Sequence, residues 1–298
     1  MITVFGSINL DLVVVLPHLP KAGETVSGPD HQSFAGGKGA NQALAARRAG
    51  AEVRMVGAVG QDAFADLALA NLRASGVDLA GVRAMDGATG LAFIGIDPAG
   101  ENQIIVASGA NARVEAGWLT GGLAAADTLM LQGEAPFGEV RRAMELARQA
   151  GASVFWNPAP VPGGDLRAGL EDATVLVVNE TEAAALAANL AVSGGTDSFL
   201  DHAVTPSRAV VVTLGADGVV AGKGVQRFRF KSPAVNAVDT TGAGDAFCGA
   251  LAAGLDLGRP FERAVKEGIA AGALACTVTG AQSSAPLKED IARLADEI

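Results

Sequence analysis

Aromatic residues, cysteines and histidines are scarce in this chain of 298 residues. It has no tyrosine, aromatic residues make up 4% of it, and its only two cysteines are Cys248 and Cys276. Two cysteines are too few for a disulfide framework or a zinc site, so we interpret both as buried thiols of a reducing compartment. The three histidines, His18, His31 and His202, are not spaced as metal ligands, and we expect them on the surface.

Long hydrophobic runs and positive charge are also lacking. No uncharged apolar run is long enough to span a membrane, and no basic segment precedes the first apolar run, so we expect no signal peptide. With 22 Lys and Arg against 32 Asp and Glu, the formal net charge is −10. An acidic chain is poorly suited to a nucleic-acid backbone or an anionic membrane. We therefore predict a cytoplasmic protein that binds neither nucleic acid nor membrane.

A large apolar fraction is present in an alternating pattern. Hydrophobic residues make up 49% of the chain, and short β-branched runs alternate with helical runs. This alternation predicts an α/β fold with a mainly parallel sheet covered on both faces. We see no linker or repeat and expect one domain, 1–298. Polar and glycine-rich segments at about 10–34 and 89–106 are predicted to form a lid of β-strands over a site.

The segment 237–249 contains the first chemically suggestive pattern, a turn with Gly242 and Gly244 followed by a helical run that we expect over 246–255. The first N–H groups of a helix lack internal partners and attract anions. Asp245 at this position would repel a resting phosphate, but it could accept a proton from a hydroxyl group that attacks one. The alternative is that Asp245 only caps the helix.

A second glycine-rich segment spans 36–43 and leads into a helix that we expect over 43–49. Its glycines, Gly36, Gly37 and Gly39, indicate a close approach of the backbone to a ligand. Lys38 and Asn41 add hydrogen-bond donors at the entrance to the helix. The spacing is not that of a Walker A loop. A tight turn with a capping Asn41 is the alternative.

Polar side chains also follow predicted strands. Asn9 and Asp11 alternate with apolar residues and therefore share one face of an extended segment, where they could bind sugar hydroxyls. Local hydrogen bonds in a turn are the alternative. Glu134 follows a strand expected over 128–132, at the carboxyl end where parallel α/β sheets bind ligands.

Two further segments allow both a structural and a binding interpretation. Asn179 and Glu182 stand where a strand meets a helix, with the spacing of a capping box. The glycine turn 214–218 lies between two predicted strands. It either carries a nucleotide or simply closes a hairpin.

Taken together, the segments 36–43 and 239–245 resemble the two signatures of the ribokinase-type (PfkB) carbohydrate kinase family. Shorter matches occur in family order at 6–11, 23–26, 132–134, 157–160 and 179–182. The resemblance covers essentially the whole chain. It implies a three-layer α/β/α ribokinase-like fold with a mainly parallel central sheet and a small β-strand lid.

The resemblance also implies an activity, the ATP-dependent phosphorylation of the 5-hydroxyl of D-ribose to give ribose 5-phosphate and ADP. Asp245 would be the general base, and the amides of Gly242, Ala243 and Gly244 would form an anion hole. The implied cofactors are ATP, Mg²⁺ and a monovalent cation, with K⁺ expected. Members of the family commonly dimerise through the lid strands, so we expect a homodimer.

The remaining site residues come from the same resemblance. The matched sugar positions are Asn9, Leu10, Asp11, Gly37, Lys38, Gly39, Ala40, Asn41, Ala92, Ile104 and Glu134. The matched ATP positions are Asn179, Thr213, Leu214, Gly215, Ala216, Asp217, Gly218 and Gly244. The matched monovalent-cation positions, largely backbone carbonyls, are Asp239, Thr241, Ala275, Val278, Gly280 and Ser284. Glu182 matches an acidic residue that organises Mg²⁺, mostly through water.

Three alternatives differ in function. Another acceptor, such as a fructose-like sugar, deoxyribose or a nucleoside, could use the same hydroxyl-binding residues, although the scarcity of aromatic residues disfavours adenosine. An NAD-dependent oxidoreductase would need Gly-x-Gly-x-x-Gly after a first strand, which the chain does not supply. A non-catalytic sugar sensor would have no reason to retain Asp245 with its neighbouring glycines.

Overall fold

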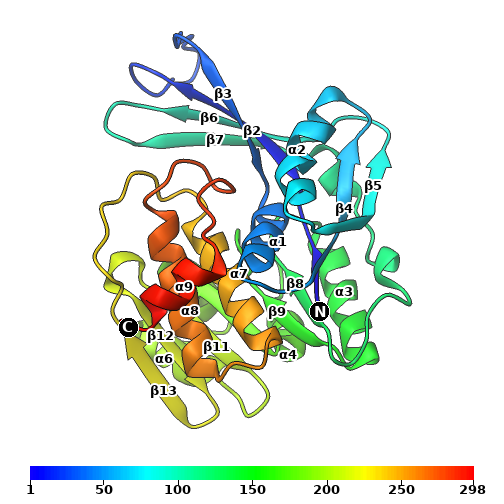
Figure 1. Ribbon diagram of the computed structural model, residues 1–298, viewed down its shortest axis with the longest axis vertical. Coiled ribbons are helices and arrows are strands. Elements are labelled where there is room, and N and C mark those ends of the chain that lie inside the picture. The colour runs from blue at the N-terminus through cyan, green and yellow to red at the C-terminus, as the bar shows by residue number, and fades with distance from the viewer.

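The computed structural model describes residues 1–298 and contains a nine-stranded sheet with helices on both faces (Figure 1). The strands of this sheet are β1 (Ile2–Phe5), β4 (Val53–Gly60), β5 (Asp78–Met85), β8 (Thr128–Leu131), β9 (Ser153–Trp156), β10 (Val175–Asn179), β11 (Ala209–Thr213), β12 (Val219–Lys223) and β13 (Gln226–Phe230). Their spatial order is β13-β12-β11-β10-β9-β8-β1-β4-β5. Neighbours from β5 to β11 are parallel, whereas β12 and β13 add an antiparallel edge. The predicted α/β fold is confirmed.

The helices form two outer layers. They are α1 (Lys38–Arg48), α2 (Ala63–Ala74), α3 (Phe137–Ala150), α4 (Arg167–Asp172), α5 (Glu180–Asn189), α6 (Gly195–Ala203), α7 (Ala243–Asp256), α8 (Phe261–Ala275) and α9 (Lys288–Ala295). One core packs α1, α2, α7 and α8 against the sheet, with Leu44 and Phe247 among its residues. The other packs α3 to α6 around Trp156 and Phe199. The central strands are almost continuously apolar because both of their faces are covered.

A separate four-stranded sheet projects from the carboxyl edge of the large sheet (Figure 1). Its strands are β2 (Asn9–Val15), β3 (His31–Gly36), β6 (Gly90–Ile96) and β7 (Asn102–Ala107), in the order β3-β2-β6-β7. The pairs β2–β3 and β6–β7 are antiparallel, and β2 pairs in parallel with β6. These pairs correspond to the predicted lid segments, and we refer to this sheet as the lid.

Several local expectations were inaccurate. Helix α1 begins at Lys38 rather than at 43, and α7 begins at Ala243 rather than at 246, because the glycine-rich segments themselves form the first helical turns. Strands β5 and β13 and helices α4 and α6 were not anticipated. Cys248 is buried as expected, but Cys276 is partly exposed. The three histidines are exposed as predicted, and none of the helices has the length and apolar character needed to cross a membrane.

The two helices that follow the glycine-rich segments pack side by side. Gly249 of α7 faces α1, and a Cβ atom at this position would lie 2.5 Å from Cβ of Ala45 and 2.7 Å from the backbone N of Ala46. Only glycine permits this approach of the two backbones. The close contact brings the N-terminal turns of α1 and α7 to the same place at the carboxyl edge of the sheet.

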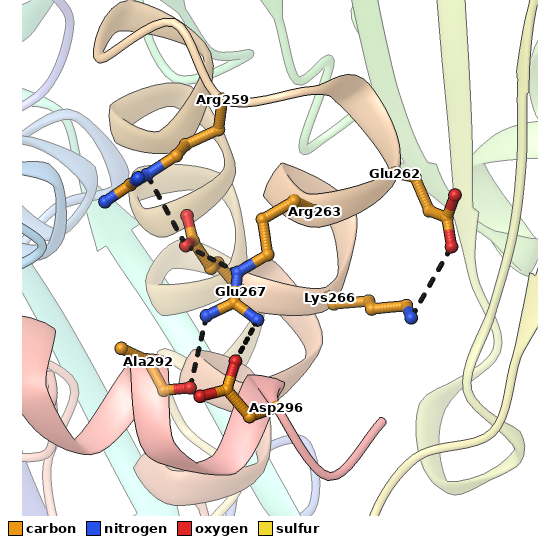
Figure 2. Close-up of polar contacts among 7 residues, drawn as sticks. All are labelled: Arg259, Glu262, Arg263, Lys266, Glu267, Ala292 and Asp296. Atoms are coloured by element: carbon orange, nitrogen blue, oxygen red, sulfur yellow. Dashed lines mark hydrogen bonds and ion pairs between the residues drawn. The ribbon is translucent and has the colours of Figure 1, made fainter.

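The C-terminal helix α9 is attached to α8 by a group of charged side chains (Figure 2). Arg263 donates to Glu267 Oε1 at 3.0 Å and to the Ala292 carbonyl at 3.2 Å, and it also pairs with Asp296. Glu267 is only 12% exposed at its side chain and is also approached by Arg259. Arg263 therefore attaches the end of α9 to α8 and also supplies a charged donor to the poorly solvated carboxylate of Glu267.

Removing Arg263 should destabilise the fold. We expect Arg263→Ala to lower the free energy of unfolding by about 1 to 3 kcal/mol, because Glu267 loses its charged donor. The matched control is Arg293→Ala, whose exposed pair with Asp290 should be worth at most about 0.5 kcal/mol. Urea denaturation followed by circular dichroism measures both changes, and equal losses in the two variants would contradict this role.

Candidate active site

The helices α1 and α7 both begin at glycines with a left-handed backbone. Gly37, the N-cap of α1, has φ 86°, and Gly242, the N-cap of α7, has φ 77°. Side chains are strained at these angles. Asn41 of α1 and Asp245 of α7 lie within one turn of these starts, and Asn41 Nδ2 donates to Asp245 Oδ2 at 3.0 Å. The two glycine-rich segments, which are about 200 residues apart in the chain, thus form one site.

Asp245 is buried and accepts hydrogen bonds on both carboxylate oxygens. It is 5% exposed, and Gln42 Nε2 donates to its Oδ1 at 3.0 Å, opposite the bond from Asn41. No side chain caps α7, so the interpretation of Asp245 as a helix cap is wrong. Its carboxylate instead points at α1. This placement is suited to a general base that must be held in one orientation.

The first amides of α7 differ in their hydrogen bonding. The N–H groups of Gly242 and Gly244 have no backbone partner, whereas the N–H of Ala243 donates to the Thr240 carbonyl at 3.2 Å. Free N–H groups at the start of a helix attract anions. Two of the three residues predicted to form an anion hole therefore present free amides here.

Glu134 connects β8 to the start of α1. Its Oε2 accepts from Ser7 Oγ at 2.5 Å and from the backbone N–H of Lys38 at 3.0 Å. Ser7 Oγ in turn accepts from the N–H of Gly39 at 3.3 Å. The predicted sugar positions Lys38, Gly39 and Glu134 are thus brought together, and Ser7 is a member of the site that the sequence did not single out.

Asn9 is held by a residue that was missed, Asn111. The Nδ2 group of Asn111 donates to Asn9 Oδ1 at 2.7 Å and to the Ile8 carbonyl, while its Oδ1 accepts from the Ile8 N–H. Because these bonds occupy Asn9 Oδ1, they turn the Nδ2 donors of Asn9 away from Asn111. Asn111 lies in a short 3₁₀ turn, Gly109–Arg113, and no sequence pattern pointed to it.

Asp11, Glu134, Asp245 and Lys38 form an electrostatically coupled group. The pKa of Asp11 is raised to about 7, chiefly by burial and further by the negative charges of Glu134 and Asp245. The pKa of Lys38 is also raised, chiefly by the charge of Asp245; burial opposes this, and Glu134 and Glu182 add to it. Acidic groups thus outnumber cations here before any ligand is bound.

Four of the predicted sugar positions contribute little side-chain chemistry. Leu10 and Ala40 are buried in the core, so only their backbone groups could reach a ligand. Ala92 is buried in β6 and lies opposite Asp11 in the strand register. Ile104 lies on the edge strand β7 and is 52% exposed, so it is not brought together with the other sugar positions.

A cavity of about 530 Å³ lies beside the start of α7 and is lined by both α7 and α8. The predicted ATP positions that line it are Thr213, Gly215, Ala216, Gly218 and Gly244. Leu214 and Asp217 belong to the same turn but do not line the cavity, and neither does Asn179. Asn179 is nevertheless paired with Thr213 in the strand register, so it ends β10 beside the cavity.

Asn179 and Glu182 form the capping box that their spacing indicated. Asn179 Oδ1 accepts from the Glu182 N–H at 2.8 Å, and Glu182 Oε2 accepts from the Asn179 N–H at 2.8 Å. The pKa of Glu182 is raised, chiefly by burial. Lys38 and Asp245 are close enough to affect this pKa, which places Glu182 within the electrostatic field of the site.

The predicted cation positions come from two segments that Asp239 joins. Its Oδ1 accepts from the Thr241 N–H and its Oδ2 from the Gly280 N–H, both at 2.8 Å. Burial alone would raise the pKa of Asp239, but these hydrogen bonds outweigh it and lower the pKa. Backbone carbonyls and a carboxylate are ligands suited to a hard cation. The structure contains no cluster of three His, Cys, Asp or Glu side chains that could hold a metal ion.

A group of buried amides surrounds Asp245. Gln42, Gln132 and Asn157 are 0%, 2% and 7% exposed, respectively. Gln42 is hydrogen-bonded to Asp245, Gln132 and Asn157. None of the three was assigned a role from the sequence. What distinguishes them is that they are polar residues in buried positions, and only the fold shows that these positions are buried.

The fold and the site define the class of the protein. The model of the pfkB family carbohydrate kinases matches residues 1–288. The chain therefore belongs to this family.

Several known proteins with similar sequences and structures are ribokinases. The Haemophilus influenzae ribokinase is 36% identical over 300 residues, covering 97% of this chain and 96% of the relative. The crystal structure of a ribokinase from Thermotoga maritima has a TM-score of 0.89 and 35% identity, covering 99% of both chains. The Arabidopsis thaliana ribokinase complexed with ribose and ATP has a TM-score of 0.84 and 29% identity, covering 99% of this chain and 98% of that one.

The raised pKa of Asp11 predicts a pH-dependent cost to stability. Between its ordinary value of 3.8 and about 7, the folded protein holds a proton that the unfolded chain has lost, so the contribution of Asp11 to stability decreases as the pH rises. We expect Asp11→Asn to be about 1 to 3 kcal/mol more stable than the wild type at pH 8 and nearly equal to it at pH 4.

Denaturant melts of both proteins across this pH range measure the difference. The control is Asp66→Asn, a substitution of an exposed carboxylate on α2. A constant difference between wild type and Asp11→Asn at all pH values would show that Asp11 is not the cause.

Proposed function

We propose that this protein transfers the γ-phosphoryl group of ATP to the 5-hydroxyl of D-ribose, giving ribose 5-phosphate and ADP. The observation that carries the proposal is the buried Asp245 at the start of α7, held by donors from the first glycine-rich segment. The similarity to ribokinases over nearly the full chain supports ribose as the acceptor.

In this mechanism Asp245 accepts the proton of the attacking hydroxyl. Asn41 and Gln42 hold its carboxylate while the free amides of Gly242 and Gly244 face the transferred group. Phosphoryl transfer depends mainly on positioning and charge stabilisation, and preorganised amides supply the second of these at no cost of reorganisation. Asn9, Asp11, Lys38 and Glu134 surround the same place and would bind the sugar.

The nucleotide would occupy the cavity between the 214–218 turn and α8, with its phosphates toward Gly244. The Glu182 carboxylate would organise Mg²⁺ through water, and the ion would supply neutralisation of phosphate charge when bound with ATP. The two segments that Asp239 joins would hold a monovalent cation, expected to be K⁺, largely through backbone oxygens. Closure of the lid would exclude water and so limit hydrolysis of ATP without sugar.

The proposal is tested by measuring ADP release with ATP, Mg²⁺ and K⁺ against D-ribose, 2-deoxyribose, D-fructose and adenosine. We expect the largest kcat/KM with D-ribose. Asp245→Asn should lower kcat by about 10²- to 10⁴-fold, because the attacking hydroxyl loses its base, while sugar binding changes little. Asp66→Asn is the control for loss of a carboxylate. Preference for another acceptor would assign the sugar-site residues to a different ligand. Near-normal turnover in Asp245→Asn would refute the role of Asp245 as the general base.

We also propose that two copies of the chain associate through their lids. Apolar side chains are exposed on the lid, including Val15, Phe93, Ile104, Ile105 and Val106, with Ile105 at 65% exposure. The edge strand β7 is exposed along its whole length and offers unpaired backbone groups to a second copy.

This association predicts a dimer that one charge on the lid abolishes. Ile105→Asp should convert the dimer to a monomer in sedimentation velocity, because an unpaired carboxylate cannot be buried in an apolar interface. Val225→Asp is the matched control, since Val225 is 98% exposed in a turn far from the lid. A monomeric wild type, or an Ile105→Asp variant that still dimerises, would contradict the proposal.

A further inference from the structure

Three buried amide side chains connect the centre of the large sheet to Asp245. Gln42 lies in the middle and uses both of its N–H donors and its amide oxygen in this connection. Its Nε2 donates to Asp245 Oδ1 at 3.0 Å and to Asn157 Oδ1 at 3.0 Å, and its Oε1 accepts from Gln132 Nε2 at 2.9 Å. A primary amide nitrogen has two N–H donors, so no donor of Gln42 is left for a ligand.

The direction of this chain of hydrogen bonds is fixed by the backbone of β10. Asn157 Nδ2 donates to the carbonyl of Val177 at 2.9 Å. A carbonyl can only accept, so the nitrogen end of Asn157 must face the strand and its oxygen end must face Gln42. The nitrogen of Gln42 must then face Asn157, and the same nitrogen points at Asp245.

Gln132 reinforces this direction from the other side. Its Nε2 donates to the oxygen end of Gln42, and its own Oε1 is buried without a partner. A Cβ atom on Gly6 would lie 2.0 Å from that oxygen, so glycine at this position leaves the space for Gln132. Leaving Gln132 Oε1 unsatisfied normally costs free energy. In this orientation, however, the Nε2 group of Gln132 donates to Gln42.

A reversed amide would place oxygen against oxygen at one end of Gln42 and nitrogen against nitrogen at the other. Its Oε1 would face the Asp245 carboxylate and Asn157 Oδ1, and its nitrogen would face the nitrogen of Gln132. None of these three contacts is a hydrogen bond, so only one orientation of the Gln42 amide is favourable in the buried site. In that orientation Asp245 receives two N–H donors and cannot rotate freely.

We propose that Gln42 is a positioning residue for Asp245, and that Asn157 and Gln132 act through it by fixing which end of its amide faces the carboxylate. The inference rests on the proposed role of Asp245 as the base. Asn157 and Gln132 would then affect turnover without contacting either substrate, because a small displacement of a catalytic group is sufficient to slow a reaction strongly.

The test separates turnover from binding and stability. Gln42→Met keeps the length of the side chain but removes its polar end; we expect kcat to fall by about 10- to 100-fold, with the Kd for D-ribose and for ATP within about threefold of the wild type. Asn157→Leu should lower kcat in the same way. The double variant should have the kcat of Gln42→Met alone, because both substitutions break one chain of interactions.

Thr174→Val is the matched control. Thr174 Oγ1 bonds the backbone of Val154 at the opposite edge of the sheet, so its loss should reduce stability without lowering kcat. If Gln42→Met does not fold, Gln132→Met replaces it, since this variant removes one donor and an already unpartnered oxygen. A several-fold lower kcat is expected there too.

The possible outcomes distinguish this inference from the proposed function. The positioning role of Gln42 would be overturned if kcat of Gln42→Met, or of its replacement Gln132→Met, lay within about twofold of the wild-type value. An inactive Asp245→Asn variant would in that case still support Asp245 as the general base. Multiplicative effects of Gln42→Met and Asn157→Leu in the double variant would overturn the linkage between them. Normal turnover in Asp245→Asn would instead remove the proposed function itself.

Discussion

The hydrogen bonds between α1 and Asp245 are the interaction on which the rest of the site depends. A carboxylate that is 5% exposed must receive donors, and here both donors come from a helix that lies about 200 residues earlier in the chain. They reach Asp245 only because α1 and α7 touch at Gly249 and Ala45. Small residues along these helices are therefore needed to bring Asp245 within reach of its donors. Any larger side chain at this contact would separate the first turn of α1 from the first turn of α7, and with them the proposed sugar and phosphate positions.

The balance of charge in the site opposes stability. Glu134, Asp245 and Glu182 all act on Lys38, and Glu134 and Asp245 also act on Asp11. Burial and mutual repulsion raise the pKa of Asp11 to about 7. Such a group destabilises the fold when it is ionised, and functional sites commonly carry costs of this kind. Hydroxyl groups of a sugar would supply the donors that Asp11 lacks in the protein alone, which suits a neutral polyhydroxylated ligand better than an anionic one.

Much of the fold and part of the site could be predicted from the sequence. The alternation of β-branched and helical runs predicted the layered α/β sheet, and the polar and glycine-rich segments predicted strands of the lid. The two glycine-rich segments pointed to Asn41 and Asp245, because glycine and polar residues at helix starts have a local physical meaning. Asn111, Gln132 and Asn157 could not be identified in this way. Their roles depend on partners from other elements, and an isolated amide in a sequence has no partner to reveal it.

The relative placement of the proposed nucleotide cavity and the proposed sugar residues suits the proposed transfer. The cavity is lined by the 214–218 turn, by α8 and by the first residues of α7, so its contact with Gly244 lies at the free helix amides. Of the proposed sugar positions, Asn41 reaches the same helix start from α1 through its hydrogen bond to Asp245. Asp245 follows Gly244 directly in α7 and is hydrogen-bonded to α1. A hydroxyl held on the α1 side would thus lie within reach of both the base and the phosphate, as a general base that accepts the proton during the attack requires.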